Sequence, residues 1–146
     1  MTVLDTSAAI DFLLGDAAAA DVERLMSREG TLAAPDALVF EVLAVLRRDV
    51  GRGKLSPERA GGAVEDLGDL ALELFPALPI RERAWALREN LTAADALFVA
   101  LAEMLNEPLA TKDAALAAAA RRHADVETLE LPLEDAAVVD VSGAST

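Results

Sequence analysis

Cysteine is absent from the 146 residues, and histidine occurs only once, at His123. The absence of cysteine excludes disulfide bridges, thiolate zinc sites and thiol chemistry. His123 follows Arg121 and Arg122 near the end of an alanine-rich segment, so we interpret it as a helix-end residue rather than a metal ligand. A metal site in this chain would therefore be built from oxygen ligands.

Basic residues are scarce as well. The chain has 13 lysines and arginines against 26 acidic residues, which gives a net charge of −13. Taken alone, this balance argues against nucleic-acid binding, because nucleic-acid-binding domains are usually basic. It favours a cation site or a basic protein partner.

Long apolar runs are also missing, although 53% of the residues are hydrophobic. No stretch approaches the roughly 18 consecutive apolar residues of a membrane-spanning helix. No basic leader precedes the first apolar run, so we expect no signal peptide and a cytoplasmic protein. The length and the hydrophobic content are typical of one folded domain with a core of its own.

Strand and helix signals alternate along the chain. Strands are predicted at residues 3–4, 31–34, 72–75, 109–111 and 126–131. Helices are predicted at about 7–14, 18–28, 35–50, from 56 onward, 80–90, 92–105 and 113–123. Strands separated by helices imply parallel pairing with right-handed crossovers, so the predicted fold is α/β, with helices on both faces of a central parallel sheet. We expect a main domain over 1–132 and an extension over 133–146 that is loosely ordered at its end.

Four acidic residues stand where predicted strands lead into helices. Three of them, Asp5, Asp95 and Asp113, lie at strand-to-helix junctions, and Glu41 lies less than two turns into a helix that follows a strand. In a parallel sheet these places face one edge, where α/β proteins bind their ligands. Four converging carboxylates would repel one another unless a cation neutralised them. Oxygen ligands without histidine or cysteine suit Mg²⁺ or Mn²⁺.

Each acid also has a purely structural interpretation. Asp5 and Asp113 could cap the helices that follow them, and Thr92 with Asp95 resembles a capping box. Glu41 could lie at a rim that faces water. Its helix, however, is apolar nearly all round, which predicts a buried helix, and no basic residue lies one turn from Glu41. A carboxylate there would require a cation or a hydrogen bond.

The motifs around these acids resemble those of the PIN-domain ribonucleases, in particular the VapC-type toxins. The resemblance extends from residue 1 to about 131, and the motifs occur in the order that the family has. Its pieces are Val3-Leu4-Asp5-Thr6-Ser7; Pro35 with Glu41-Val42; Leu91-Thr92-Ala93-Ala94-Asp95-Ala96-Leu97 with Ala100-Leu101-Ala102-Glu103; and Leu109-Ala110-Thr111-Lys112-Asp113-Ala114-Ala115-Leu116-Ala117.

The resemblance implies a PIN-like nuclease domain that cuts RNA with bound Mg²⁺ or Mn²⁺. The implied metal-binding acids are Asp5, Glu41, Asp95 and Asp113. Ser7 and Thr111 would support them as nearby hydroxyl groups. Toxins of this type dimerise and are inhibited by a cognate antitoxin, which often inserts an arginine into the acidic site. The resemblance therefore implies a homodimer, an RNA substrate and an antitoxin partner.

A local cluster of basic residues offers a place for RNA in spite of the acidic total. Arg47, Arg48 and Arg52, followed by Lys54 and Arg59, could track a phosphate backbone. The alternative is that this cluster is an ordinary solvated face.

Other α/β proteins with acids at strand ends fit less well. A receiver domain needs an adjacent acidic pair after its first strand, and this chain offers only Asp5 there. A haloacid-dehalogenase-type phosphatase needs Asp-x-Asp, and residue 7 is serine. A non-catalytic PIN-fold module that acts through protein contacts stays open, because a sequence does not show turnover.

Overall fold

Five short segments pair into one parallel sheet in the computed structural model, which describes residues 1–133. The strands are β1 (Val3–Leu4), β2 (Leu32–Pro35), β3 (Leu72–Phe75), β4 (Leu109–Thr111) and β5 (Thr128–Glu130). They lie in the order β3-β2-β1-β4-β5, and every neighbouring pair is parallel. The three central strands are buried throughout, as expected for apolar strands that are covered on both faces.

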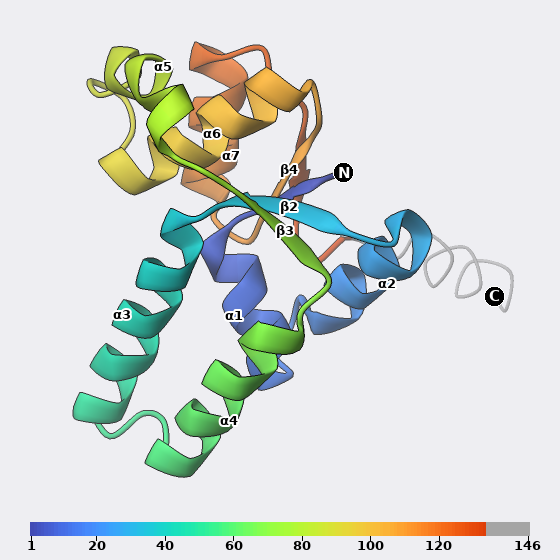
Figure 1. The fold of residues 1–146 in the computed structure, drawn as a ribbon, viewed down its shortest axis with the longest axis vertical. Helices are drawn as coiled ribbons and strands as arrows, with labels where there is room; N and C mark the ends of the chain where they lie inside the picture. Colours follow the sequence, from blue (N-terminus) through green and yellow to red (C-terminus); the bar gives the residue numbers. More distant parts are fainter. Residues whose placement is uncertain (134–146) are drawn as a thin grey trace, which may run out of the picture.

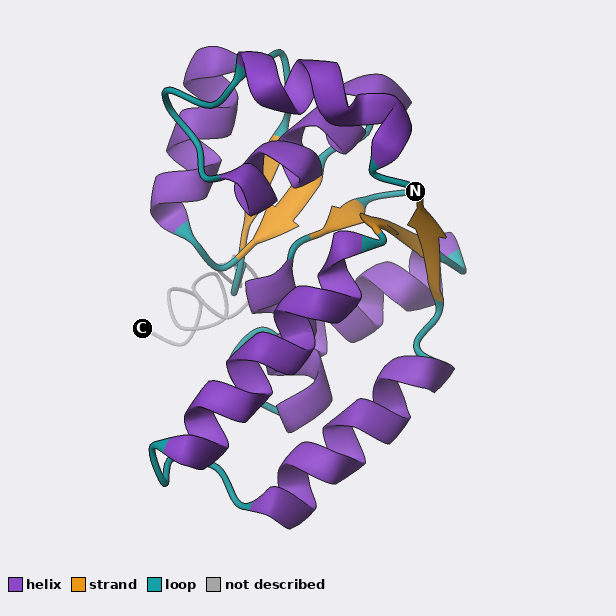
Figure 2. Ribbon diagram, turned by 60° about the vertical axis from the view of Figure 1, so that its left-hand side comes forward, coloured by secondary structure: helices purple, strands orange, loops and turns teal. Residues whose placement is uncertain are grey.

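Helices cover both faces of this sheet, as Figures 1 and 2 show. One face carries α1 (Thr6–Leu14), α2 (Ala19–Glu29), α3 (Ala37–Gly51) and α4 (Pro57–Asp69). The other face carries α5 (Arg81–Ala86), which follows a 3₁₀ turn at Leu78–Ile80, then α6 (Ala93–Leu105) and α7 (Ala114–His123). The predicted α/β fold, a parallel sheet between two layers of helices, is confirmed.

The strand order locates the position where a ligand site is expected. The chain runs from β1 through β2 to β3 in one direction, and then crosses to β4 and β5 on the other side of β1. The direction of winding therefore reverses between β1 and β4, and such a reversal opens a crevice at the carboxyl ends of the two strands. The backbone N–H of Asp5 donates to the carbonyl oxygen of Ala110 at 3.1 Å, so these two strand ends lie side by side.

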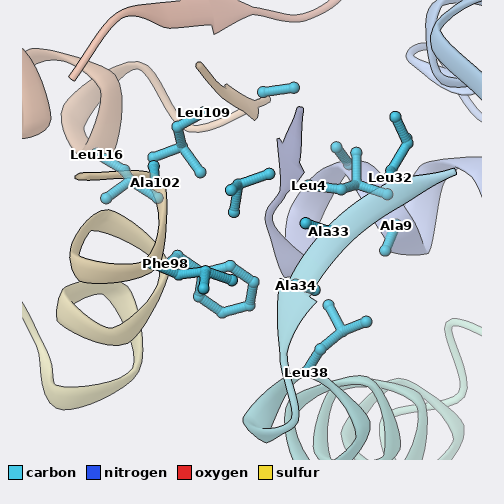
Figure 3. Close-up of a cluster of buried hydrophobic side chains, with 14 of the residues drawn as sticks. Leu4, Ala9, Leu32, Ala33, Ala34, Leu38, Phe98, Ala102, Leu109 and Leu116 are labelled. Carbon is cyan, nitrogen blue, oxygen red and sulfur yellow. The ribbon is translucent and has the colours of Figure 1, made fainter. Parts of the chain in front are cut away.

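The core joins the two helical layers through the sheet. Figure 3 shows Phe98 of α6 pointing toward the sheet strands, near Ala34 and Leu38. Leu4 and Leu109 fill the middle of the sheet, and all of these side chains are almost completely buried. Phe98 also lines the cavity at the carboxyl edge, so the core and that cavity share a wall.

Most predicted elements agree with the structure to within one or two residues, and three differ. Pro35 was expected in the first turn of a helix but is the last residue of β2, where a missing N–H costs at most one terminal ladder bond. The helix expected over 80–90 ends at Ala86, and the strand expected over 126–131 covers Thr128–Glu130.

Helix α3 is not the buried helix that its composition predicted. Only Leu38, Val42 and Leu46 are buried, whereas Phe40 is 74% exposed and Leu43 is 44% exposed. The reason is that only the start of α3 lies against the sheet, and the rest extends away from it beside α4 (Figure 1). The apolar composition of α3 predicted burial, but it did not show which sides of the helix have other parts of the protein packed against them.

Residues 134–146 lie outside the described part of the chain, and with them most of the predicted extension over 133–146 and its loosely ordered end. Within residues 1–133, no helix combines the length and the apolar character needed to cross a membrane.

Candidate active site

Three helices begin at the carboxyl edge of the sheet, and each has a polar side chain at its start. The carboxylate of Asp5 accepts from Ala8 N at 3.1 Å and caps α1. The hydroxyl of Thr92 accepts from Asp95 N at 3.2 Å and caps α6. Asp113 caps α7 by accepting two backbone N–H groups of its first turn. The positive ends of three helix dipoles therefore favour negative charge at this edge.

All four predicted acids line one cavity of about 440 Å³ at this edge. Asp5 comes from the end of β1, Glu41 from α3, Asp95 from α6 and Asp113 from the start of α7. The cavity thus gathers side chains from segments that are more than a hundred residues apart in sequence. Its other charged residues are Asp11, Asp16, Arg48, Asp49 and Lys112.

A hydroxyl network fixes Asp5 at the centre of the site. Thr111, which is fully buried, donates from Oγ1 to Asp5 Oδ2 at 2.7 Å. The same hydroxyl accepts from the backbone N–H of Asp113 at 2.9 Å, so it links two of the acids. Ser7 donates from Oγ to Asp5 Oδ1 at 2.8 Å and accepts from Lys112 N at 3.1 Å. Ser7 and Thr111 thus lie where the sequence analysis expected supporting hydroxyl groups.

Glu41 is held from α1 rather than by burial. Thr6 donates from Oγ1 to Glu41 Oε1 at 2.6 Å, and the Glu41 residue is partly exposed. The expected burial of Glu41 is therefore wrong, whereas one of the two alternatives expected for its carboxylate, a hydrogen bond, is present. What the structure offers instead is a half-buried carboxylate with a fixed orientation toward the cavity.

The pKa values of two acids show that these carboxylates are in an unfavourable environment when charged. Burial raises the pKa of Asp5 from 3.8 to about 6, in spite of hydrogen bonds from Thr111, Ala8 and Ser7, and the charge of Asp95 adds to the rise. Burial also raises the pKa of Asp95, and the charge of Asp113 contributes. The charge of Asp113 thus opposes ionisation of Asp95, and the charge of Asp95 opposes ionisation of Asp5.

The donor set suits a hard divalent cation in kind, since it consists of carboxylate and hydroxyl oxygens. Within residues 1–133, however, no three acidic or histidine side chains lie close enough together to hold one metal ion. The carboxylates surround a common cavity without converging on a point. Binding of an ion would require these side chains to draw closer.

Three residues that line the cavity were not predicted from the sequence: Thr6, Asp11 and Lys112. Thr6 orients Glu41 as described, and its position next to Asp5 was the available signal. Asp11 is buried on α1, where its carboxylate accepts from Lys112 Nζ at 2.9 Å and from Ala18 N at 3.0 Å. No local pattern pairs residues 11 and 112, because the contact exists only once β1 and β4 are neighbours.

The three arginines proposed as RNA contacts lie in different places. Arg48 lines the cavity, with its Nε 3.3 Å from the carboxylate of Asp49. Arg47 lies in a groove between α3 and α4, and Arg52 follows the far end of α3. The structure therefore brings Arg48 to the acids but not Arg47 or Arg52.

A family model for the PIN domain matches residues 2–122, which is most of the chain. The chain belongs to the PIN domain family. The predicted resemblance is thereby confirmed, and the matched range contains all four acids and both supporting hydroxyl residues.

Curated relatives of this PIN domain carry the name VapC. Ribonuclease VapC1 of Mycobacterium tuberculosis (strain H37Rv) is 42% identical over 118 residues, which cover 80% of this chain and 89% of the relative. Ribonuclease VapC12 of the same strain is 37% identical over 127 residues, which cover 87% of this chain and 98% of the relative. The chain thus spans nearly the full length of relatives that are named as ribonucleases.

A solved structure supports the fold of this PIN domain. The crystal structure of PAE2754 from Pyrobaculum aerophilum aligns with a TM-score of 0.67, covering 99% of this chain and 90% of that chain. Its sequence identity is 18%, so the likeness concerns the fold alone.

Proposed function

We propose that this protein is a metal-dependent endoribonuclease and the toxin of a type II toxin–antitoxin pair. The observation that carries the proposal is the single cavity at the β1–β4 edge, into which four distant segments bring Asp5, Glu41, Asp95 and Asp113. The PIN family match and the ribonuclease relatives add support for RNA as the substrate.

The four acids would hold Mg²⁺ or Mn²⁺. When bound, such an ion lowers the pKa of a coordinated water and neutralises charge on the scissile phosphate. The roles of the surrounding residues follow from their hydrogen bonds. Thr111 and Ser7 hold both oxygens of Asp5 in place, and Thr6 holds one oxygen of Glu41, so hydroxyl groups orient these two carboxylates, around which the others would draw closer.

Substrate binding would depend on overcoming the negative charge of the cavity. The acids repel RNA until a cation neutralises them, so the metal would bind before the RNA. Arg48 is the basic residue on the cavity wall that extends from α3, and we assign it to a phosphate of the substrate. Lys112 also lines the cavity, and its ammonium group donates to the carboxylate of Asp11.

The same acidic cavity suggests how the partner acts. A carboxylate cluster attracts a basic side chain, and arginine pairs with carboxylates through two hydrogen bonds. We assign to the antitoxin an apolar helix that lies beside the acids and an arginine or lysine placed near Asp5 and Asp95. The active form would be a homodimer in the cytoplasm, as in other toxins of this type.

Cleavage of RNA by purified protein tests the proposal. The wild-type protein should cut a generic single-stranded RNA with Mg²⁺ or Mn²⁺ and should stop in EDTA. The Asp95→Asn variant, prepared in parallel, should cut at least a hundredfold more slowly and so exclude a contaminating nuclease. RNA that stays intact with either ion would contradict the proposal.

One observation favours a second candidate, a non-catalytic PIN-fold module that binds protein. No three of the described acidic side chains lie close enough together to hold an ion. Such a module would bind the antitoxin but leave RNA uncut at any metal concentration, so the same cleavage assay separates the two candidates.

A further inference from the structure

A second cavity lies on the other side of the start of α6 from the acids, and its main feature is an exposed tryptophan. Trp85 of α5 is 68% exposed and is the only tryptophan in the chain. The cavity has a volume of about 430 Å³, and its floor is formed by Ala84, Leu91 and Leu97. A large aromatic ring that is left in solvent beside an apolar hollow is a feature of binding surfaces.

Two arginines accompany this ring. The guanidinium carbon of Arg88 lies 4.7 Å from the centre of the Trp85 ring, and its Nη1 donates to the Trp85 carbonyl at 3.1 Å. Arg81 also lines the cavity; it donates to the Leu78 carbonyl at 2.9 Å and lies 4.0 Å from the carboxylate of Glu82. Each guanidinium has five N–H donors, so both keep donors for a further ligand. An aromatic ring with cations around it matches a base and its phosphates.

The position of this cavity relative to the acids fits a single substrate. Figure 1 shows α5 beside the beginning of α6. Residues two positions apart on a helix lie about 200° apart around its axis. Ala93 and Leu97, which line the tryptophan cavity, therefore lie opposite Asp95, which lines the acidic cavity. A helix is about 10 Å wide, so a short single-stranded segment crossing the start of α6 would reach both cavities.

We propose that Trp85, with Arg81 and Arg88, is a base-stacking subsite for single-stranded RNA, a few nucleotides from the scissile phosphate. This subsite rests on the proposed ribonuclease function and specifies its substrate as RNA that is unpaired on that side. Stacking tolerates any base, because every base presents a flat face. The subsite therefore contributes affinity and requires a single strand, without selecting a sequence.

A second copy of the chain is a less suitable occupant of this surface. A twofold-symmetric contact places the same patch on both subunits. The patch carries Arg81 and Arg88, with the Glu82 carboxylate 4.0 Å from Arg81, so such a contact would bring four guanidinium groups together with two carboxylates and leave an excess of positive charge. Like charges placed face to face are costly, whereas RNA supplies the opposite charge.

The test combines kinetics with the fluorescence of the single tryptophan. With Mg²⁺ and a 12-nucleotide mixed-sequence RNA, Trp85→Leu should raise KM about 5- to 150-fold and change kcat by less than twofold, because stacking holds the substrate without touching the reacting atoms. The KM of Trp85→Phe, which keeps an aromatic face, should lie between those of the wild type and Trp85→Leu. In the wild type, stopped-flow mixing with RNA should quench the Trp85 fluorescence before cleavage.

Met104→Ala is the matched control, because Met104 is also an exposed apolar residue, 53% exposed, but lies near the far end of α6. Its KM should equal that of the wild type. An unchanged KM for Trp85→Leu, or fluorescence that RNA does not quench, would overturn the subsite while leaving cleavage by the wild type intact. A Trp85→Leu protein that turns from dimer to monomer in sedimentation with unchanged KM would assign the surface to self-association. Wild-type protein that cuts no RNA would overturn the proposed function itself.

Discussion

The two ends of α6 carry acids in opposite electrostatic environments. At its start, burial raises the pKa of Asp95, and the charge of Asp113 adds to the rise. Near its end, Glu103 receives two hydrogen bonds from Arg83, at 2.6 and 2.9 Å, and this pairing lowers the pKa of Glu103. The two residues lie about two turns apart on one helix, so helix position alone does not explain the difference.

The comparison separates structural acids from functional ones. Glu103 has a cation of its own, as does Asp11, which is paired with Lys112. Asp5 accepts from hydroxyl and backbone donors, and Asp95 interacts with the hydroxyl of Thr92, but neither has a cationic partner among residues 1–133, and each lies near another carboxylate. An acid that the fold keeps charged without compensation is a mark of a functional site. Under the proposed function, a metal ion or an antitoxin arginine would supply the missing positive charge.

The largest expected effect comes from removing the charge of Asp5, the most buried of the four predicted acids that line the cavity. Because burial raises the pKa of Asp5 from 3.8 to about 6, ionised Asp5 costs the metal-free fold up to about 3 kcal/mol at pH 7. Asp5→Asn keeps a side-chain oxygen for the cap of α1 and removes this cost. In EDTA the variant should therefore unfold in urea with a higher free energy than the wild type.

The pH dependence of this difference checks its cause. A raised carboxyl pKa means that the folded protein binds the proton more tightly, so the wild type gains stability as the pH falls from about 6 to about 4. The advantage of Asp5→Asn should shrink over this range and vanish below it. Asp11→Asn is the control, because it leaves Lys112 without its carboxylate and should destabilise the protein at pH 7. A wild-type protein as stable as Asp5→Asn at pH 7 would contradict the electrostatic argument.

Asp95→Asn should affect catalysis more than folding. The variant keeps the cap from Thr92, since the backbone N–H of residue 95 is unchanged. Apo stability should hold or rise, because repulsion with Asp5 and Asp113 falls. The cleavage rate should fall a hundredfold or more if the site supplies about 2.7 kcal/mol of barrier reduction. If Asp95→Asn lost stability but still cut RNA at the wild-type rate, Asp95 would be a capping acid only.

A bound metal ion should compensate the charge of Asp95 at the start of α6, as Arg83 compensates the charge of Glu103 near its end. An ion that binds only the folded protein stabilises it by about 1.4 kcal/mol at ten times Kd. Thermal melting with millimolar Mg²⁺ or Mn²⁺ against EDTA should show this rise for the wild type and for Glu103→Gln. Asp95→Asn should show a smaller rise at the same concentration. A rise of equal size in all three proteins would place the bound ion outside the acidic cavity.

The site residues that the sequence predicted most directly are those that closely follow a strand. Asp5 and Asp113 follow short apolar strands, and parallel pairing sends such positions to one edge whatever the details of packing. Asp95 was expected at a strand-to-helix junction, which is wrong because α6 follows α5; Asp95 reaches this edge from the first turn of α6, after its Thr92 cap. These inferences depend on local sequence and on one topological rule.

The remaining parts depend on contacts between segments that no local pattern connects. Thr6 reaches Glu41 across 35 residues, and Lys112 reaches Asp11 across 101 residues. The burial of Glu41 was mispredicted because only one side of α3 meets other parts of the protein. The separation of the carboxylates around the cavity also depends on side-chain directions, which residue spacing does not determine.

The smallest expected effect is that of Glu103→Gln, and it has the opposite sign to Asp5→Asn. The variant removes the charge that Arg83 pairs with, and both side chains are partly exposed, so the loss should be a few tenths to about 1 kcal/mol at pH 7. A carboxyl group whose pKa is lowered in the folded protein stabilises the fold at pH values above its unfolded pKa of 4.5. This stabilisation is lost as the pH falls through the lowered pKa of the folded protein. The difference in unfolding free energy between wild type and Glu103→Gln should therefore shrink as the pH falls. It shrinks for Asp5→Asn as well, but there the variant is the more stable protein at pH 7, whereas here it is the less stable one. Urea unfolding at pH 7 and at pH 3.5 measures the loss of stability and its pH dependence. The rate of RNA cleavage by Glu103→Gln should stay within twofold of the wild type. If Glu103→Gln abolished cleavage while Asp95→Asn did not, the two ends of α6 would have to exchange their assigned roles.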